Sequence, residues 1–208
     1  LSVMSDHGFS TFSRAIHLNA WLMREGFLTL SDPSATGDEE LFAHVDWSQT
    51  QAYALGLNEI YLNLAGREPN GIVSAGAESR ALMAKIRRRL LALKDPQSGR
   101  AAVREVYSSS QISAGPPPAH APDLVVGYEP GFRASWQTAL GAVPATVIAD
   151  NSEAWLADHC IDPQFVPGVF VSNRLPRLAN PHLRDIPVTI LRFFGLTPPQ
   201  VMTGKDIF

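Results

Sequence analysis

The fold is decided by a stretch that begins with Glu59-Ile60-Tyr61-Leu62-Asn63-Leu64, where apolar and polar side chains alternate as in a half-buried strand. From about Ala77 to Lys94, apolar residues recur at helical spacing, and Asp95-Pro96 should end that helix. Val103–Tyr107 and Asp123–Tyr128 are predicted to be strands. Strands that alternate with helices predict an α/β domain with a mainly parallel central sheet flanked by helices.

Two further helices are predicted outside this stretch, over Phe12–Arg24 and Asp185–Gly195. Gly26 follows the first of them at a position where glycine commonly ends a helix. The chain has 208 residues, which is long enough for a sizeable core. We therefore expect a single α/β domain over residues 1–208.

The composition is that of an ordinary globular protein, with 45% apolar residues, 18% charged residues and a net charge of −3. This balance gives no electrostatic reason to expect a nucleic-acid polymer as a partner. The one dense basic run, Lys85–Arg89, falls on the polar face of the helix predicted over Ala77–Lys94. No apolar run reaches the roughly 18 to 20 residues of a membrane span.

Cys160 is the only cysteine, so the chain can form no internal disulfide and no thiol-rich zinc site. Histidine and carboxylate side chains remain as the metal ligands that the sequence offers. The cellular compartment stays open, because exported proteins can also lack disulfides. Cytoplasmic and exported locations both fit the sequence.

An Asp-His pair, Asp6-His7, follows a short apolar run at the start of the chain and is followed by Gly8. Neighbouring carboxylate and imidazole groups can both bind one divalent metal ion, and glycine lets the backbone turn close to a ligand. The alternative is a plain surface turn with a helix-capping role. Because the pair lies so near the start of a chain without an initiator Met, we expect the C-terminal part of a metal-dependent enzyme.

Four passages together resemble one known family. They are Met4-Ser5-Asp6-His7-Gly8-Phe9; Ile60–Leu64 with Gly66-Arg67-Glu68 and Gly71-Ile72-Val73; Pro122–Val126 with Trp136; and Asp158-His159-Cys160 with the closing segments Val188–Gly195 and Thr203–Asp206. In this order they resemble the C-terminal part of the type I phosphodiesterase/nucleotide pyrophosphatase family of the alkaline phosphatase superfamily. The likeness covers most of the chain and implies an alkaline-phosphatase-like fold.

The resemblance also implies a site with two divalent metal ions, zinc in the usual case, with manganese or iron as alternatives. Asp6 and His7 would hold the ion that binds the nucleophile. His159 matches the late histidine that holds the other ion. Asp158 would orient the imidazole of His159, or else it is a solvated carboxylate.

In the resembling family, the Ser or Thr nucleophile and the remaining metal ligands lie upstream of the part that this chain matches. We therefore expect the full-length protein to be a metal-dependent phosphoester hydrolase, most similar to a phosphodiesterase or nucleotide pyrophosphatase. A small phosphoester or nucleotide would be its substrate. The chain by itself is expected to be inactive.

Two alternatives stay open at the level of sequence. One is a related enzyme of the phosphomutase or sulfatase type. The other is a non-catalytic α/β domain that serves in binding or assembly, and there an exposed sheet edge would favour oligomers. Loss of metal-dependent hydrolysis on Asp6→Ala or His159→Ala would distinguish an enzyme from a binding domain.

Overall fold

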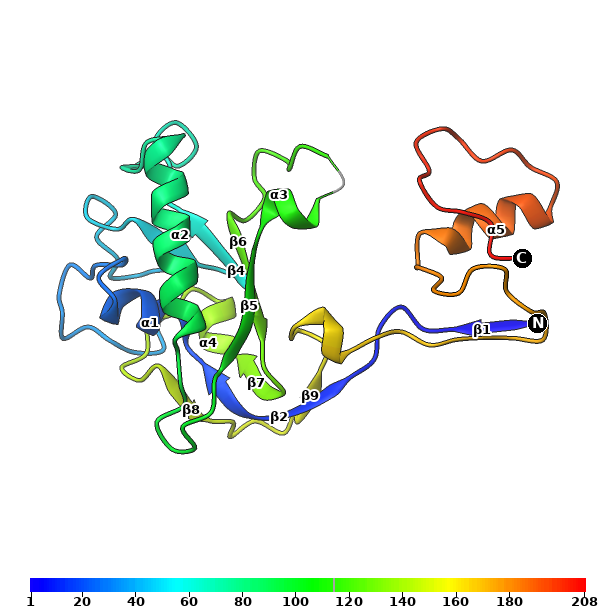
Figure 1. The fold of residues 1–208 in the computed structure, drawn as a ribbon. Helices are drawn as coiled ribbons and strands as arrows, with labels where there is room; N and C mark the ends of the chain where they lie inside the picture. The colour runs from blue at the N-terminus through cyan, green and yellow to red at the C-terminus, as the bar shows by residue number, and fades with distance from the viewer. Residues whose placement is uncertain (114) are drawn as a thin grey trace. The chain divides into compact units, whose positions relative to one another are not determined.

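The computed structural model describes residues 1–113 and 115–208, which divide into two compact units (Figure 1). Unit 1 combines the start of the chain, Leu1–Gly8, with its last part, Pro167–Phe208. Unit 2 is the continuous segment Phe9–Val166. The single domain expected over residues 1–208 stays a prediction.

Unit 1 is built on a two-stranded antiparallel ribbon and one helix. Strand β1 (Ser2–Met4) pairs with β10 (Phe170–Ser172), and helix α5 spans Asp185–Phe193, close to the prediction. The chain end returns to this helix, because the Ile207 backbone N–H donates to Thr189 Oγ1 at 3.0 Å. Ile207 is fully buried as a result.

The first sheet of unit 2 has β2 (Ser10–Ile16) at its centre, paired with β7 (Gly131–Ala134), β8 (Ile148–Asp150) and β9 (Ala157–Asp158). Only the β2–β7 pairing is parallel. The helix predicted over Phe12–Arg24 is therefore wrong in its first part, and helix α1 covers only Leu18–Arg24. Phe12, Arg14 and Ile16 are buried at a spacing of two, the period of a strand.

The second sheet contains β3 (Ala52–Ala54), β4 (Glu59–Leu62), β6 (Leu124–Tyr128) and β5 (Val103–Ser108), in the order β3-β4-β6-β5. Every pairing between these strands is antiparallel. The predicted α/β fold with a mainly parallel central sheet is therefore wrong. The chain instead has a mixed β fold, rich in antiparallel pairs and with few helices.

The order of the strands explains why the strand–helix–strand pattern in the sequence wrongly predicted a parallel sheet. Helix α2 (Ala77–Leu91) does connect β4 to β5, and these two strands run in the same direction because each is antiparallel to β6. However, β6 is inserted between them, so the connection is a split βαβ unit in which no parallel pair forms. Periodicity identifies the elements but not the strand that lies between them.

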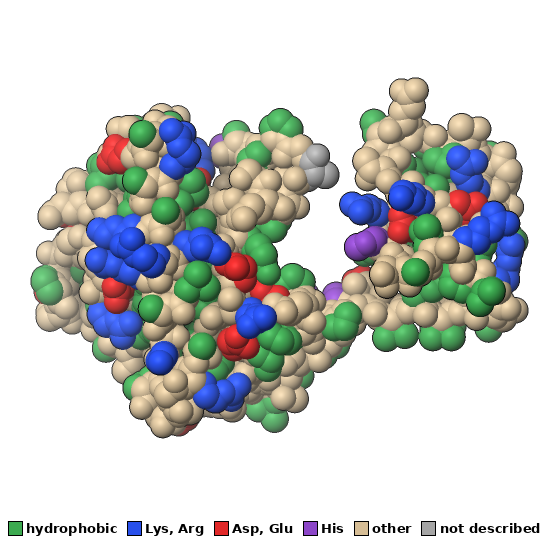
Figure 2. All heavy atoms as spheres, in the orientation of Figure 1, with side chains coloured by type: hydrophobic (Ala, Val, Ile, Leu, Met, Phe, Trp, Pro, Cys, Tyr) green, Lys and Arg blue, Asp and Glu red, His purple; other side chains and the backbone are tan. Residues whose placement is uncertain are grey.

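The core of unit 2 is continuous and includes one face of α2, where Leu82, Ile86 and Leu90 are buried. The basic residues of α2 lie on its outer side, where Figure 2 shows Lys and Arg side chains gathered along the helix. Arg87 binds the Glu105 carboxylate at 2.7 Å and Arg89 binds Glu25 at 3.1 Å. Part of this positive charge is thus paired within the chain.

Three short helical segments complete unit 2. They are α3 (Ser109–Ile112), α4 (Trp136–Ala139) and the 3-10 turn η1 (Pro163–Phe165). The loop predicted over Ser108–Pro122 contains α3, and residue 114 of that loop lies outside the described residues. Among the residues that the structure does describe, no helix is long and apolar enough to cross a membrane.

Candidate metal-binding residues

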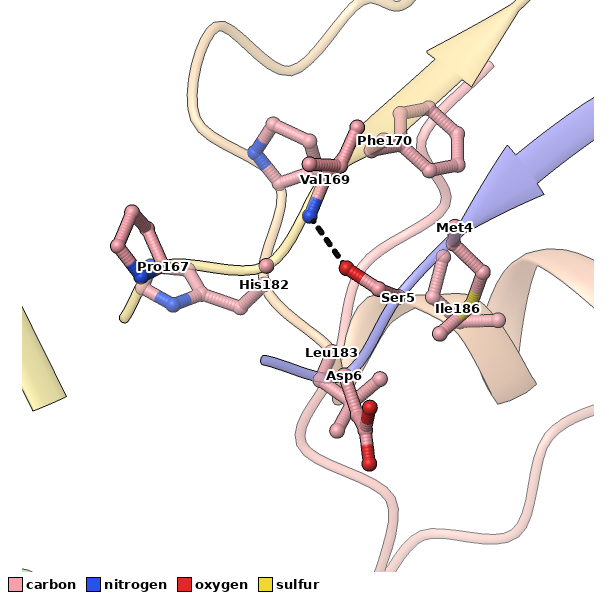
Figure 3. Close-up of a pocket in the computed structure, with 11 residues that line it drawn as sticks. Met4, Ser5, Asp6, Pro167, Val169, Phe170, His182, Leu183 and Ile186 are labelled. Carbon is pink, nitrogen blue, oxygen red and sulfur yellow. Dashed lines mark hydrogen bonds between the residues drawn. The ribbon is translucent and has the colours of Figure 1, made fainter. Parts of the chain in front are cut away.

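In unit 1, Asp6 and His7 follow directly on strand β1, and the preceding residue fixes the turn. The Ser5 backbone N–H donates to Val169 O at 2.9 Å, and the Val169 N–H donates to Ser5 Oγ at 2.9 Å (Figure 3). A Cβ atom at Gly168 would lie only 2.5 Å from Ser5 O, so glycine is required for this close approach. The backbone that presents Asp6 is therefore held from both sides of the ribbon.

The side chains of Asp6 and His7 have a geometry that fits one shared metal ion. His7 Nδ1 lies 2.9 Å from Gly8 O, so Nε2 is the nitrogen that would ligate a metal. Nε2 lies 3.6 Å from Asp6 Oδ2. Two donors at zinc bond lengths of about 2.0–2.1 Å and a tetrahedral angle lie roughly 3.3 Å apart. A small side-chain movement would bring both atoms onto one ion, and both side chains are accessible, with 66% of Asp6 and 29% of His7 exposed.

A cavity of about 270 Å³ in unit 1 lies beside Asp6 (Figure 3). Its walls combine the end of β1 with Pro167–Phe170 and with the segment that leads into α5, including His182 and Ile186. The sequence alone shows only that His182 lies shortly before the helix predicted over Asp185–Gly195. Its presence in this wall could not be read from the sequence, because more than 170 residues separate it from Asp6.

In unit 2, His159 follows strand β9 and is positioned by Asp158. Asp158 Oδ1 accepts the backbone N–H of His159 at 2.6 Å and that of Cys160 at 3.1 Å. The same oxygen lies 3.3 Å from His159 Nδ1. A carboxylate on one imidazole nitrogen fixes the ring and makes the other nitrogen the metal-binding atom, as in many metal sites. The His159 side chain is 47% exposed, so a ligand can reach it.

Asp158 is itself held by a buried cation. Arg133 Nε donates to Asp158 Oδ2 at 2.5 Å, and the two side chains are only 3% and 8% exposed. The guanidinium also stacks on Trp136, 4.4 Å from the ring centroid, and on Phe12 at 5.3 Å. Burial raises the pKa of Asp158, but the hydrogen bonds from Cys160 and His159 and the charge of Arg133 outweigh burial and hold it below its usual value. Asp158 is therefore ionised at neutral pH.

Asp158, His159 and Cys160 form a group whose potential ligand atoms all lie within 4.8 Å of one another. Asp158 is already committed to Arg133 and to two backbone N–H groups. Burial and the neighbouring Asp158 raise the pKa of the Cys160 thiol to about 12, so the thiol is protonated at neutral pH. Within this group the imidazole of His159 is the best ligand, and Asp158 acts as the group that positions it.

The predicted ligands are thus divided between the two units: Asp6 and His7 belong to unit 1, and His159 belongs to unit 2. Each local geometry fits a metal-binding role, whereas their meeting at one site stays a prediction. Searches among family models, curated proteins and solved structures found no match to this chain. The resemblance to the phosphodiesterase family, and the two metal ions that it implies, therefore stay predictions as well.

Proposed function

We propose that the full-length protein is a metal-dependent phosphoester hydrolase of the phosphodiesterase or nucleotide pyrophosphatase kind, with two divalent ions. The observation that carries the proposal is the chain of contacts from Arg133 through Asp158 to His159. A buried carboxylate that is paired with a cation and contacts one nitrogen of a half-exposed imidazole is the arrangement that supports metal binding by the other nitrogen. A second support is the 3.6 Å spacing between His7 Nε2 and Asp6 Oδ2.

In this proposal each residue of the chain has one task. Asp6 and His7 bind the ion next to the nucleophile, and His159 binds the second ion. Asp158 orients the His159 ring, and Arg133 keeps Asp158 ionised. When bound, the ions would lower the pKa of the nucleophile and neutralise charge on the phosphate.

The proposed substrate is a small phosphoester or nucleotide. The cavity beside Asp6 has a volume of about 270 Å³, close to the lower end of the range for small-molecule sites. A cavity of that size suits a compact phosphoester better than a long polymer. The net charge of −3 likewise gives no general attraction for polyanions.

The proposal can be tested with the full-length protein by assaying bis-p-nitrophenyl phosphate and p-nitrophenyl phosphate with added zinc or manganese. His7→Ala and His159→Ala should each lower diester hydrolysis on the order of 100-fold or more, because loss of a direct ligand should exceed the 10- to 100-fold cost of losing an outer partner. His120→Ala is the matched control, since His120 is exposed in the loop after α3. Bound metal should fall in the two ligand variants and stay unchanged in the control.

The outcomes separate the open alternatives. Hydrolysis of the monoester alone would favour the phosphatase or mutase side of the superfamily over a diesterase. Absence of hydrolysis of either ester, with metal content equal in His7→Ala and wild type, would refute the enzyme and favour a non-catalytic binding or assembly protein. Tryptophan fluorescence of each variant would show whether unit 2 has kept its fold.

A further inference from the structure

Unit 2 contains a second cavity, of about 380 Å³, whose walls include none of the proposed metal ligands. It lies between the loop before β3 and the turn after β4. Its walls combine aromatic and polar side chains, among them Phe42, Trp47, Tyr53, Asn63, Glu68 and Asn70. Cavities of this size, mostly apolar with a few polar groups, are typical of small-molecule sites.

Three aromatic rings form the apolar part of the cavity. Phe42, Trp47 and Tyr53 lie with their ring centroids 5.2 to 5.5 Å apart, and each pair is close to perpendicular. Tyr53 also stacks on Tyr61, with the ring planes 15° apart. All four rings are partly exposed. Centroids this close leave no space between the rings for a quaternary ammonium ion, whereas a flat molecule can stack against their outer faces.

The position of Phe42 requires an unfavourable backbone. Leu41 and Phe42 have φ angles of 58° and 59°, a conformation that side-chain-bearing residues rarely adopt. It is held by hydrogen bonds from the Leu41 N–H to Leu140 O and from the Phe42 N–H to Gly141 O. Backbone strain of this kind is unfavourable and clusters at functional sites. Here its result is that the Phe42 ring packs against Trp47 and Tyr53.

Hydrogen-bond acceptors form the polar part of the cavity. Asn63 is completely buried, and its Nδ2 donates to the backbone oxygens of Trp47, Thr50 and Asn70. Its Oδ1 has no hydrogen-bond partner among the described residues. Three carbonyls around Nδ2 fix the orientation of this amide, since the opposite orientation would place oxygen against oxygen. A buried acceptor without a partner is unfavourable, so a ligand whose donor reaches Asn63 Oδ1 would be favoured.

Glu68 adds a second acceptor to the same walls. Its Oε2 accepts the Leu64 backbone N–H, and its Oε1 accepts from Arg67 Nε and, at 3.3 Å, from the Tyr53 hydroxyl. Burial, followed by the charge of Glu68, raises the pKa of Tyr53 to about 12, so this hydroxyl stays a donor at neutral pH. Arg67 pairs with Glu68 and also with Asp123, so it balances the Glu68 carboxylate only in part, and the site favours ligands that bring hydrogen-bond donors.

From these features we propose that the cavity binds a small, neutral, flat nitrogen heteroaromatic ring that carries an amino group. The ring would stack on the aromatic walls, and its N–H groups would donate to Asn63 Oδ1 and Glu68. Asparagine amides pair with the amino edge of adenine in this way elsewhere, and aromatic side chains stack on such rings. Neither metal nor phosphate takes part, so this inference does not rest on the proposed function.

The experiment is a calorimetric titration of the whole protein with adenine. Wild type is compared with two variants, in each of which one tryptophan is replaced by leucine. Trp47→Leu removes a wall of the cavity, and Trp155→Leu is the matched control, because Trp155 is 56% exposed and lies outside the cavity. We expect saturable binding that Trp47→Leu weakens at least tenfold, the factor that corresponds to about 1.4 kcal/mol of lost stacking. Trp155→Leu should bind as wild type does.

Two further measurements distinguish weaker binding from misfolding and an amino-bearing ring from other ligands. Asn70→Ala changes an exposed side chain at the cavity and should fold normally while weakening adenine binding a few-fold. Unsubstituted purine, which lacks the amino donor, should bind more weakly than adenine. Absence of saturable adenine binding to wild type, equal affinity in Trp47→Leu and Trp155→Leu, or tighter binding of tetramethylammonium than of adenine would each overturn the proposal.

Discussion

The substitution Asp158→Asn tests the contacts that position His159. It keeps the size of the side chain and leaves an oxygen that can still accept the backbone N–H groups of His159 and Cys160. It removes the negative charge beside Arg133, whose side chain is 3% exposed. The main consequence is therefore an uncompensated buried cation.

The magnitude follows from that burial. Removing one partner of a buried ion pair costs about 3–5 kcal/mol, because the remaining charge has lost both its solvent and its partner. The rings of Trp136 and Phe12 contact Arg133 with or without Asp158, so they do not offset the change. A domain is stable by only about 5–15 kcal/mol, so the loss should be a large fraction of the stability of unit 2.

A urea titration followed by tryptophan fluorescence measures this effect. All four tryptophans of the chain lie between residues 9 and 166, so the signal reports on unit 2. Glu105→Gln is the matched control, because it removes the carboxylate from the 2.7 Å ion pair with Arg87, in which the two side chains are 46% and 34% exposed. An exposed pair contributes at most about 1 kcal/mol.

The double variant Arg133→Met with Asp158→Asn decides the interpretation. If the loss in Asp158→Asn comes from the unpaired cation, removal of that cation should restore most of the stability. A loss in Asp158→Asn no larger than in Glu105→Gln would refute the reasoning. So would a double variant whose loss of stability relative to wild type equals the sum of the losses in Arg133→Met and Asp158→Asn.

Three further predictions concern unit 1, and hydrogen exchange of its backbone amides measures each of them. Hydrogen bonds from the backbone N–H groups of His182 and Lys205 lower the pKa of Asp185, so the contribution of this carboxylate to stability is complete above an unfolded pKa of about 3.9 and is lost as pH falls through the lower folded value. Protection of the α5 amides should therefore fall with acid in wild type and should show no such loss in Asp185→Asn. Protection that does not depend on acid in wild type would contradict this prediction. Gly204→Ala would place a Cβ atom 2.0 Å from the backbone oxygen of Arg184, so exchange should accelerate in the chain end, whereas unchanged exchange would show that the contact relaxes freely. Gly168→Ala would place a Cβ atom 2.5 Å from Ser5 O, so exchange should accelerate in the amides of the β1–β10 ribbon. Wild-type protection of those amides would contradict this prediction.

The sequence predicts which segments of unit 2 are regular but not how they are ordered. Alternation over Glu59–Leu64 and the helical spacing over Ala77–Lys94 find β4 and α2 within a few residues. The same patterns occur in a parallel βαβ unit and in a split one, since both contain a strand, a helix and a strand. The insertion of β6 depends on contacts made more than 60 residues along the chain, such as the pairing of Ile60 with Leu124. Local periodicity carries no information about such a pairing.

For the candidate metal-binding residues too, the sequence predicts one part of the arrangement and not the other. Asp6-His7 and Asp158-His159 are neighbours in sequence, so their chemistry can be read directly. Arg133 could have been noticed as a charge inside the apolar strand β7, where a buried cation demands a carboxylate partner. Nothing in the sequence names that partner, because the two residues are separated by 25 positions and come together only when β7 and β9 both pair with β2.

Asn63 shows how the same alternation that finds a strand can conceal a binding cavity. In the pattern Glu59–Leu64 it occupies a polar position, which predicts an exposed side chain. The strand ends at Leu62, however, and Asn63 is fully buried because its amide joins three backbone carbonyls, those of Trp47 and Thr50 in the turn before β3 and that of Asn70 in the turn after β4. Those turns carry the residues around the cavity, so the amide that organises them also supplies the unpaired acceptor. An alternation rule treats each polar residue as a surface residue and therefore misses a polar group whose function is internal.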